Sequence, residues 1–156
     1  MAHLRFLYRR PVVDSGGPGK YRGGLSHEVA FTAKPDALLD DKLRITFFGK
    51  GVRSPMAHGL FGGYPGCPIG YATFRDLTPA GMLERPRAHD PRSVEHQSWG
   101  TFEISSRDLQ VIRYSGGGGY GDPLERDPDA VSRDVVEGAV SDRAARDVYC
   151  YDNHNN

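Results

Sequence analysis

The residues of this chain that could do chemistry lie mostly among its glycines. One run reads Ser-Gly-Gly-Gly-Gly-Tyr-Gly, in which Gly116, Gly118 and Gly121 have the G-x-G-x-x-G spacing of loops that bind a dinucleotide pyrophosphate. Such a loop opens directly into a helix whose N–H groups face the phosphates, whereas Pro123 and Pro128 follow here before a helix can start. We therefore predict a structural role for these glycines, with nucleotide binding as the less favoured alternative.

Other candidate groups lack the neighbours that their chemistry needs. Lys50 lies between Gly49 and Gly51, without the Ser or Thr that holds a metal in a P-loop. His58 and Cys67 have metal-ligand chemistry, but one histidine and one distant cysteine do not have the spacing of a metal site. No His or Asn lies at a recognisable offset from Cys67, so we interpret it as a small apolar filler. We expect no catalytic, cofactor-binding or metal-binding residue in this chain.

Arg22 is the strongest candidate for an ion pair. It follows Tyr21 within a glycine-rich passage, residues 14–25, where few other large side chains could anchor the backbone. A guanidinium can satisfy several carbonyls or a carboxylate where glycines leave the backbone open. We predict a buried or interfacial ion pair, and the binding of a substrate carboxylate or phosphate is the less favoured alternative.

Composition limits the size of the core that must position these residues. The chain has 156 residues, enough for one domain, and 20 Gly with 11 Pro make up about a fifth of it. Apolar residues are 38% of the chain and the mean hydropathy is −0.54. We expect much irregular backbone and a thin core that a partner surface completes.

Charge and cysteine content exclude several classes of function. Twenty basic and 20 acidic residues give a formal net charge of 0, so neither nucleic acid nor an anionic membrane is an expected partner. The N-terminus is too polar for a signal sequence, and no apolar run approaches the ~18 residues of a membrane span. With two cysteines far apart, we expect a reducing cytoplasm.

Alternating apolar residues predict five strands. Their ranges are 4–8, 28–33, 42–47, 99–104 and 109–114. We expect the second strand to pair with the third, antiparallel, and the last two to form a hairpin. The charged and proline-rich stretch 75–98 is predicted to be a surface loop, with His89 and His96 solvated.

The end of the chain predicts two short helices. In the first, Asp127 is the N-cap, Pro128 takes the first position and Gly138 is the left-handed cap. Ser141 caps the second helix, with Val140 and Ala145 as the hydrophobic staple. Ala144, Val148 and Tyr151 form its apolar side. The fold class expected is α+β and mainly β, a barrel-like antiparallel sheet with Gly/Pro-rich polyproline-II-like segments and two short C-terminal helices.

Three stretches resemble the hydantoinase B, oxoprolinase and acetone carboxylase family. They read Asp-Ser-Gly-Gly-x-Gly-x-Tyr-Arg-Gly-Gly-Leu at 14–25, Gly-Leu-x-Gly-Gly-x-Pro-Gly at 59–66 and Gly-Gly-Gly-Gly-Tyr-Gly-Asp-Pro-x-Glu-Arg-Asp-Pro at 116–128. The resemblance implies one domain over 1–149, similar to the C-terminal part of hydantoinase B, before a disordered polar tail, 150–156. The expected structural and interface motif is Gly17, Gly19, Tyr21, Arg22, Gly23, Gly24, Gly62, Gly63, Pro65, Gly66, Gly116, Gly117, Gly118, Gly119, Tyr120, Gly121, Asp122, Pro123 and Arg126.

The resemblance also implies where the chemistry lies. Family members are far longer, and their metal-binding carboxylates and histidines belong to an N-terminal portion that has no counterpart here. The expected partners are therefore a larger hydantoinase B-like subunit and hydantoinase A-like ATPase subunits, which would carry ATP and a divalent metal. The chain would be a small non-catalytic subunit of an ATP-dependent ketone carboxylase, which phosphorylates a ketone and bicarbonate and joins them into a β-keto acid.

Within this reading, an acetophenone carboxylase is favoured over an acetone carboxylase, because small subunits of the latter would be rich in cysteine.

Two alternatives to a ketone carboxylase stay open at this point. The first alternative is the split C-terminal piece of an ATP-dependent hydantoinase or 5-oxoprolinase. The second is a free-standing glycine-rich interaction module without an enzyme complex.

Overall fold

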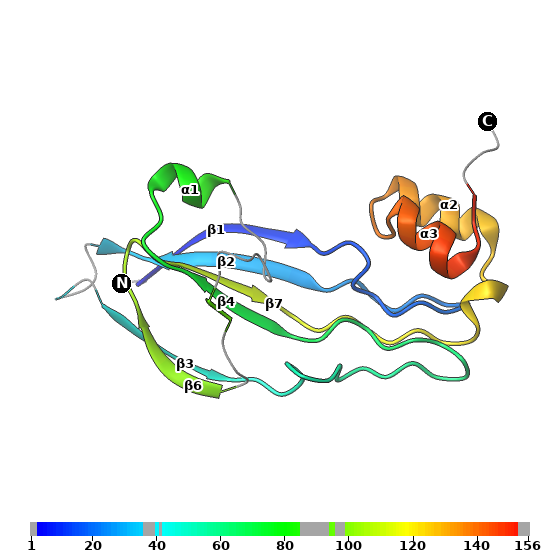
Figure 1. Cartoon of the computed structure of the whole chain (residues 1–156), viewed down its shortest axis with the longest axis horizontal. Coiled ribbons are helices and arrows are strands. Elements are labelled where there is room, and N and C mark those ends of the chain that lie inside the picture. Colours follow the sequence, from blue (N-terminus) through cyan, green and yellow to red (C-terminus); the bar gives the residue numbers. More distant parts are fainter. Residues whose placement is uncertain (1–2, 36–39, 41, 85–93, 96–98, 153–156) are drawn as a thin grey trace. The chain divides into compact units, whose positions relative to one another are not determined.

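The computed structural model forms two compact units, each built from three separate stretches of the chain (Figure 1). The sheet unit comprises Met1–Arg10, Glu28–Arg53 and Ile69–Tyr114. The glycine unit comprises Pro11–His27, Ser54–Pro68 and Ser115–Asn156. The structure describes residues 3–35, 40, 42–84, 94–95 and 99–152.

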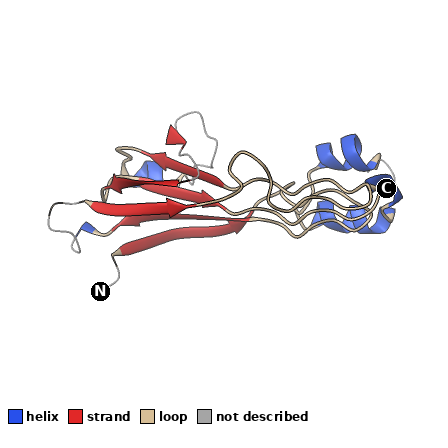
Figure 2. Ribbon diagram, turned by 90° about the horizontal axis from the view of Figure 1, so that it is seen from below, coloured by secondary structure: helices blue, strands red, loops and turns tan. Residues whose placement is uncertain are grey.

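Among the described residues, the strands form two open sheets (Figures 1 and 2). The strands are β1 (Leu4–Pro11), β2 (His27–Ala33), β3 (Leu43–Phe48), β4 (Gly70–Phe74), β5 (Val94–Glu95), β6 (Trp99–Ile104) and β7 (Leu109–Arg113). One sheet has the order β1-β2-β7-β4-β5 and the other consists of β3 and β6. The predicted barrel-like closure is wrong, because the two-stranded sheet pairs only within itself and the larger sheet ends at β1 and β5.

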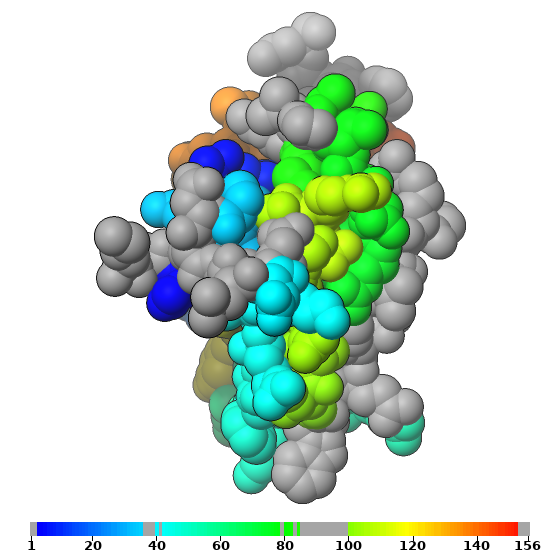
Figure 3. Space-filling view, turned by 90° about the vertical axis from the view of Figure 1, so that its left-hand side faces the viewer, coloured from blue at the N-terminus to red at the C-terminus, as the bar shows by residue number. Residues whose placement is uncertain are grey.

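Both predicted strand pairings are wrong as well. β2 pairs antiparallel with β7, opposing Glu28 to Arg113, and β3 pairs antiparallel with β6, opposing Leu43 to Ile104. Figure 3 shows β3 and β6 side by side on one face. The chain changes sheets at the turn between β6 and β7, so these two neighbours in sequence do not share a ladder, and β2 and β3 likewise lie in different sheets. Both predictions assumed local pairing, and burial of the apolar faces overrode it.

The interior strand β2 is buried on both faces, where the sequence predicted one buried and one solvated face. From Glu28 to Ala33 every residue is buried. Ala30 packs in one cluster with Ala72, Phe74, Leu109 and Val111, while Phe31 and Ala33 pack with Ile104 in another. The polar side chains are satisfied in place, since Glu28 accepts from Arg10 at 2.6 Å and Thr32 donates to the Ser106 carbonyl at 3.1 Å. Alternation fails here because both faces of this strand meet apolar residues.

The stretch predicted as loop 75–98 contains regular structure. Helix α1 (Pro79–Leu83) begins after Thr78, whose hydroxyl accepts from Gly81 N at 3.1 Å, and β5 follows. A hydroxyl N-cap directly before a proline is a common helix start, and this local signal outweighs the charged composition that predicted a loop. The predicted solvated histidines, His89 and His96, lie outside the described residues.

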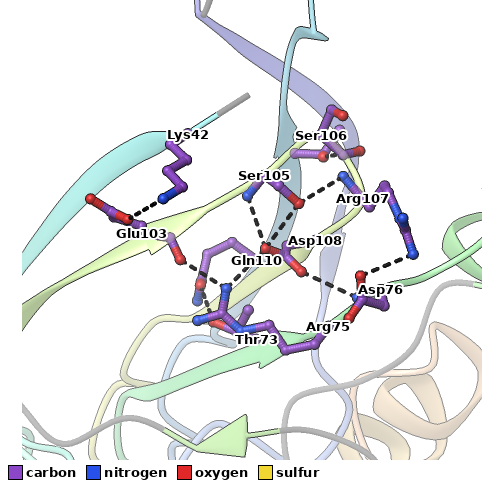
Figure 4. A network of polar contacts seen from close by, with 11 residues as sticks. Lys42, Thr73, Arg75, Asp76, Glu103, Ser105, Ser106, Arg107, Asp108 and Gln110 are labelled. Carbon is purple, nitrogen blue, oxygen red and sulfur yellow. Dashed lines mark hydrogen bonds and ion pairs between the residues drawn. The ribbon is translucent and has the colours of Figure 1, made fainter. Parts of the chain in front are cut away.

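A buried carboxylate fixes the turn between β6 and β7 (Figure 4). Asp108 accepts hydrogen bonds from the Ser105 and Asp76 backbone at 2.8 and 3.2 Å, and Arg75 pairs with it at 2.9 Å. Burial raises the pKa of the Asp108 carboxyl, but these hydrogen bonds and the Arg75 charge outweigh it and hold the pKa below its ordinary value. The turn is therefore stabilised by the ionised form of this side chain.

The two C-terminal helices form as predicted. Asp127 and Ser141 cap α2 (Pro128–Val136) and α3 (Asp142–Tyr149), accepting from Asp129 N and Ala144 N at 3.1 Å each. Gly138 has a φ of 70°, as a left-handed cap requires. Buried side chains from both helices and the link between them form one cluster, comprising Val131, Val140, Ala145 and Tyr149. The predicted tail begins with Cys150, the left-handed cap of α3, and its last residues, 153–156, lie outside the described residues.

Within the described part of the chain, no helix combines the length and apolar character that crossing a membrane demands.

Candidate functional site

Three glycine-rich segments of the glycine unit run side by side in extended conformation without forming a β-sheet (Figure 2). We call them the glycine bundle, which comprises residues 15–24, 57–67 and 115–121. The segment 115–121, which we call the central segment, forms backbone hydrogen bonds with both of the others. Gly117 N donates to the Gly24 carbonyl at 2.9 Å, and the Gly117 carbonyl accepts from Gly17 N at 2.8 Å. Gly119 donates to the Tyr64 carbonyl and accepts from Leu60 N, at 2.9 Å each, and both partners belong to the segment 57–67. This satisfies backbone groups of the central segment on more than one side.

The glycines of the central segment face different neighbours in turn. A Cβ atom added at Gly116 or Gly119 would come closer than 3.0 Å to the carbonyl of Ser15 or Pro18, and one added at Gly118 would do so at His58. Gly116 and Gly119, which are three residues apart, thus face Ser15 and Pro18, which are also three residues apart and belong to one segment. This matches the three-residue turn of a polyproline-II path and supports the predicted character of these segments.

The predicted motif glycines fall into three groups. Gly62 and Gly121 have φ of 95° and 74°, so they serve as turns. Gly24 has no atom within 4 Å of an added Cβ and shows no steric need for glycine. At the others an added Cβ would come within 3.0 Å of neighbouring backbone, and these are Gly17, Gly19, Gly23, Gly63, Gly66, Gly116, Gly117, Gly118 and Gly119. The sequence suggested a larger subunit as their neighbour, but the structure finds those neighbours within the chain itself.

The ion pair predicted for Arg22 is confirmed, and its partner is Asp134 of α2. Arg22 Nε and Nη2 both donate to the Asp134 carboxylate at 3.1 Å, and Nη1 donates to the Gly23 carbonyl at 2.7 Å. Arg126 Nη2 donates to the same carboxylate at 2.8 Å, and its Nη1 donates to the Lys20 carbonyl at 3.0 Å. One carboxylate therefore links the glycine bundle to α2 and to the segment before it. We call these three side chains the Arg-Asp-Arg cluster.

The Arg-Asp-Arg cluster is largely buried and has little capacity left for a ligand. The side chains of Arg22, Asp134 and Arg126 are 18%, 9% and 12% exposed. Each guanidinium donates to the shared carboxylate and to one backbone carbonyl, while the buried Arg126 Nε has no hydrogen-bond partner among the described residues. Burial raises the pKa of the nearby Tyr149 hydroxyl above its ordinary value, which favours the neutral phenol. The arrangement suits structural cross-linking better than acid–base catalysis.

The remaining candidate ligands act through their backbones. Cys67 N donates to the Ser15 carbonyl at 2.9 Å and its carbonyl accepts from Gly116 N at 3.1 Å, while the His58 carbonyl lies against Gly118. Across the residues that the structure describes, no three His, Cys, Asp or Glu side chains gather where they could hold a metal ion.

The other motif residues form turns and an exposed aromatic surface. Asp122 caps the short 3₁₀ helix η2 (Pro123–Glu125) by accepting from Leu124 N at 2.9 Å, and Pro123 is buried. Tyr21 and Tyr120 exchange two backbone hydrogen bonds of 2.9 Å. Their rings lie 6.2 Å apart, and the Phe61 ring lies 5.2 Å from Tyr120. We call these three exposed rings the aromatic tip.

Sequence reasoning missed three residues of this unit. Asp134 had a usable signal, because an acidic residue between Val131 and Val135 on a short helix faces the core side. No role was predicted for Tyr149. Phe61 precedes Gly62-Gly63 within a matching stretch, but nothing in the sequence shows that its ring is exposed.

Most of this chain is similar in sequence to part of two carboxylase subunits. The acetophenone carboxylase delta subunit of Aromatoleum aromaticum is 30% identical over 152 residues, covering 87% of this chain and 22% of the relative. The acetone carboxylase alpha subunit of Xanthobacter autotrophicus is 32% identical over 172 residues, covering 94% and 21%. The chain therefore spans about a fifth of the length of the curated relatives it matches.

Solved structures and a family profile agree with these relatives. A nucleotide-free acetone carboxylase, described as acting by ATP-dependent acetone carboxylation, superposes with a TM-score of 0.69 at 27% identity, covering 94% of this chain and 21% of that one. The ATP-dependent caprolactamase of Pseudomonas jessenii has a TM-score of 0.71 at 23% identity, covering 99% and 24%, which shows a shared fold. The profile of the hydantoinase B/oxoprolinase family matches residues 4–123. This chain belongs to the hydantoinase B/oxoprolinase family.

Proposed function

We propose that this chain is a non-catalytic part of an ATP-dependent ketone carboxylase, in which it completes the fold of a larger hydantoinase B-like polypeptide. The whole enzyme would join a ketone and bicarbonate into a β-keto acid in the cytoplasm. Hydantoinase A-like subunits would supply the ATPase, and ATP and a divalent metal would bind in the partner subunits. Acetophenone is the preferred substrate class, with acetone as the close alternative.

One observation carries the proposal. Nearly the whole chain, 94% of it, superposes on about a fifth of an acetone carboxylase chain with a TM-score of 0.69. Because almost all of this chain matches only a small part of a longer chain, we expect it to work together with a polypeptide that supplies the rest.

The chemistry of the described residues supports a structural role. The buried charges of the glycine unit are paired within the Arg-Asp-Arg cluster, and Asp108 of the sheet unit is paired with Arg75. Neither arrangement places a nucleophile beside a base, which a catalytic site of this kind would need.

The experiment is complementation of a truncated enzyme. A hydantoinase B-like chain from the source organism, lacking the fifth that corresponds to this chain, is co-expressed with its ATPase subunits, with and without the 156-residue chain. We expect ATP-dependent incorporation of labelled bicarbonate into acetophenone or acetone only when the chain is present. Equal incorporation without the chain would contradict the proposal.

A second candidate is an ATP-dependent hydrolase of cyclic amides. The caprolactamase subunit beta of Pseudomonas jessenii is 30% identical over 137 residues, and the caprolactamase structure shares the fold. The same reconstituted complex separates the two, because a lactamase would open the amide ring without fixing bicarbonate.

A further inference from the structure

The turn that carries Phe61 of the aromatic tip has a backbone conformation that a phenylalanine does not favour. Gly63 N donates to the Leu60 carbonyl at 3.0 Å, and the two residues between them, Phe61 and Gly62, have φ of 51° and 95°. Two successive positive φ values closed by this hydrogen bond define a type I′ turn. Asn, Asp or Gly usually occupies its first central position, because a bulky side chain is strained there.

Other described residues with positive φ have a local reason for it. Asp14 and Asp76 are of a type that tolerates this conformation, and the Asp14 carboxylate accepts from Ser141 N at 2.8 Å. Cys150 is the C-cap of α3. Phe61 belongs to a strained type, and it neither caps a helix nor carries a polar group that could hydrogen-bond to the turn. Strain of this kind is often retained where a residue has a role beyond the fold.

Folding does not bury the Phe61 ring. It is 79% exposed, and its aromatic neighbour Tyr120 is itself 47% exposed. Tyr21 and Leu60 extend the same exposed surface, at 64% and 58%. The turn therefore costs backbone strain and leaves a large apolar side chain in water. Burial of the ring in a complex would offset both costs.

Charged side chains lie beside this apolar surface. Lys20 precedes Tyr21 and pairs with Glu125 of η2 at 3.2 Å, with both side chains exposed. An aromatic centre beside exposed charged groups is the usual anatomy of a protein–protein interface, and aromatic residues at such centres carry much of the binding energy.

We propose that the aromatic tip, headed by Phe61, anchors this chain in an apolar pocket of the larger hydantoinase B-like polypeptide. This inference rests on the proposed function and names the surface that performs it. The occupant follows from the comparisons, since in the curated relatives about four-fifths of the polypeptide lies beyond the matched segment and is available to cover it.

The test uses a substitution that separates folding from docking. Phe61→Asn places the preferred Asn-Gly pair at the centre of the turn and removes the ring. We expect the melting temperature of the 156-residue chain to rise by a few degrees, because strain is relieved. Its affinity for the truncated hydantoinase B-like chain, measured by calorimetry, should fall about 30-fold, as for an interface hot spot. Val136→Ala is the matched control, since Val136 is 84% exposed on α2 in the same unit and does not belong to the aromatic tip.

Each other outcome has a definite meaning. If wild-type chain does not bind the truncated partner, the proposed function fails, whatever the variant does. If wild type binds and Phe61→Asn binds equally well, the docking role of the tip is overturned while the proposed function survives. A lower melting temperature for the variant would show that the ring stabilises the fold instead. A wild-type dimer that the variant abolishes would identify a second copy as the occupant and overturn the proposal.

Discussion

The two units hold their backbones together in opposite ways. In the sheet unit, side chains fill the space between strands, as Leu109 and Val111 do with no exposed surface. In the glycine unit, carbonyls fill the space that side chains would occupy, as at Gly116 and Gly119. Removing atoms should therefore damage the first unit, and adding them should damage the second. Apart from the apolar cluster between α2 and α3, the Arg-Asp-Arg cluster is the exception in the glycine unit, since there side chains hold the glycine bundle.

The largest effect is expected from breaking that exception. Asp134→Ala removes the carboxylate and leaves two buried guanidiniums facing each other, which should destabilise the chain by about 4 kcal/mol. Urea unfolding measures the loss. Asp147→Ala is the control, because Asp147 pairs with Arg143 on an exposed face and should matter by less than about 0.5 kcal/mol. Equal losses of unfolding free energy in the two variants would show that the buried cluster stabilises the chain no more than a surface ion pair does.

The second-largest loss of stability is expected from removing atoms from the core of the sheet unit. Leu109→Ala leaves a cavity beside Phe74 and Val111 and is expected to cost about 3 kcal/mol in urea unfolding. The matched control is Phe48→Ala, since Phe48 is 80% exposed on β3 and its loss should cost under about 0.5 kcal/mol. A small loss at Leu109 would mean that the core is not close-packed.

Adding atoms to the glycine unit is the complementary test. Gly119→Ala puts a methyl group against the Pro18 carbonyl and should cost about 2 kcal/mol. Gly24→Ala has open space and no positive φ, so stability should stay equal or rise by about 0.5 kcal/mol. If both substitutions are tolerated alike, close backbone approach does not hold this unit together.

The smallest effect concerns pH and the turn at Asp108. Its pKa is lowered by folding, so its contribution is complete above the unfolded-state pKa of about 3.9 and is lost as pH falls through the lower folded value. Asp108→Asn should cost about 1 kcal/mol near neutral pH, and the difference from wild type should shrink in acid. Asp76→Asn serves as the control, because Asp76 is exposed and its pair with Arg107 is a surface one. A difference that does not change with pH would contradict the assigned cause.

Local signals predicted the two C-terminal helices but not α1, and they predicted the sheet connectivity poorly. Asp127, Gly138 and Ser141 act through neighbours within four residues, so the sequence alone determines these caps. Strand pairing depends on which distant apolar faces meet, and β2 pairs with β7 more than 70 residues away. Arg22 was recognisable as an ion-pair residue, but its partner Asp134 lies 112 residues along the chain. The exposure of Phe61 could not be predicted, because composition and spacing do not determine which side of a turn meets solvent.

The central claim is that this chain completes a larger hydantoinase B-like polypeptide. Size-exclusion chromatography with light scattering on the co-expressed chain and truncated partner tests it most directly. The account predicts one species whose mass contains both polypeptides. Separate elution of the partner and of a 17.2 kDa chain would contradict it.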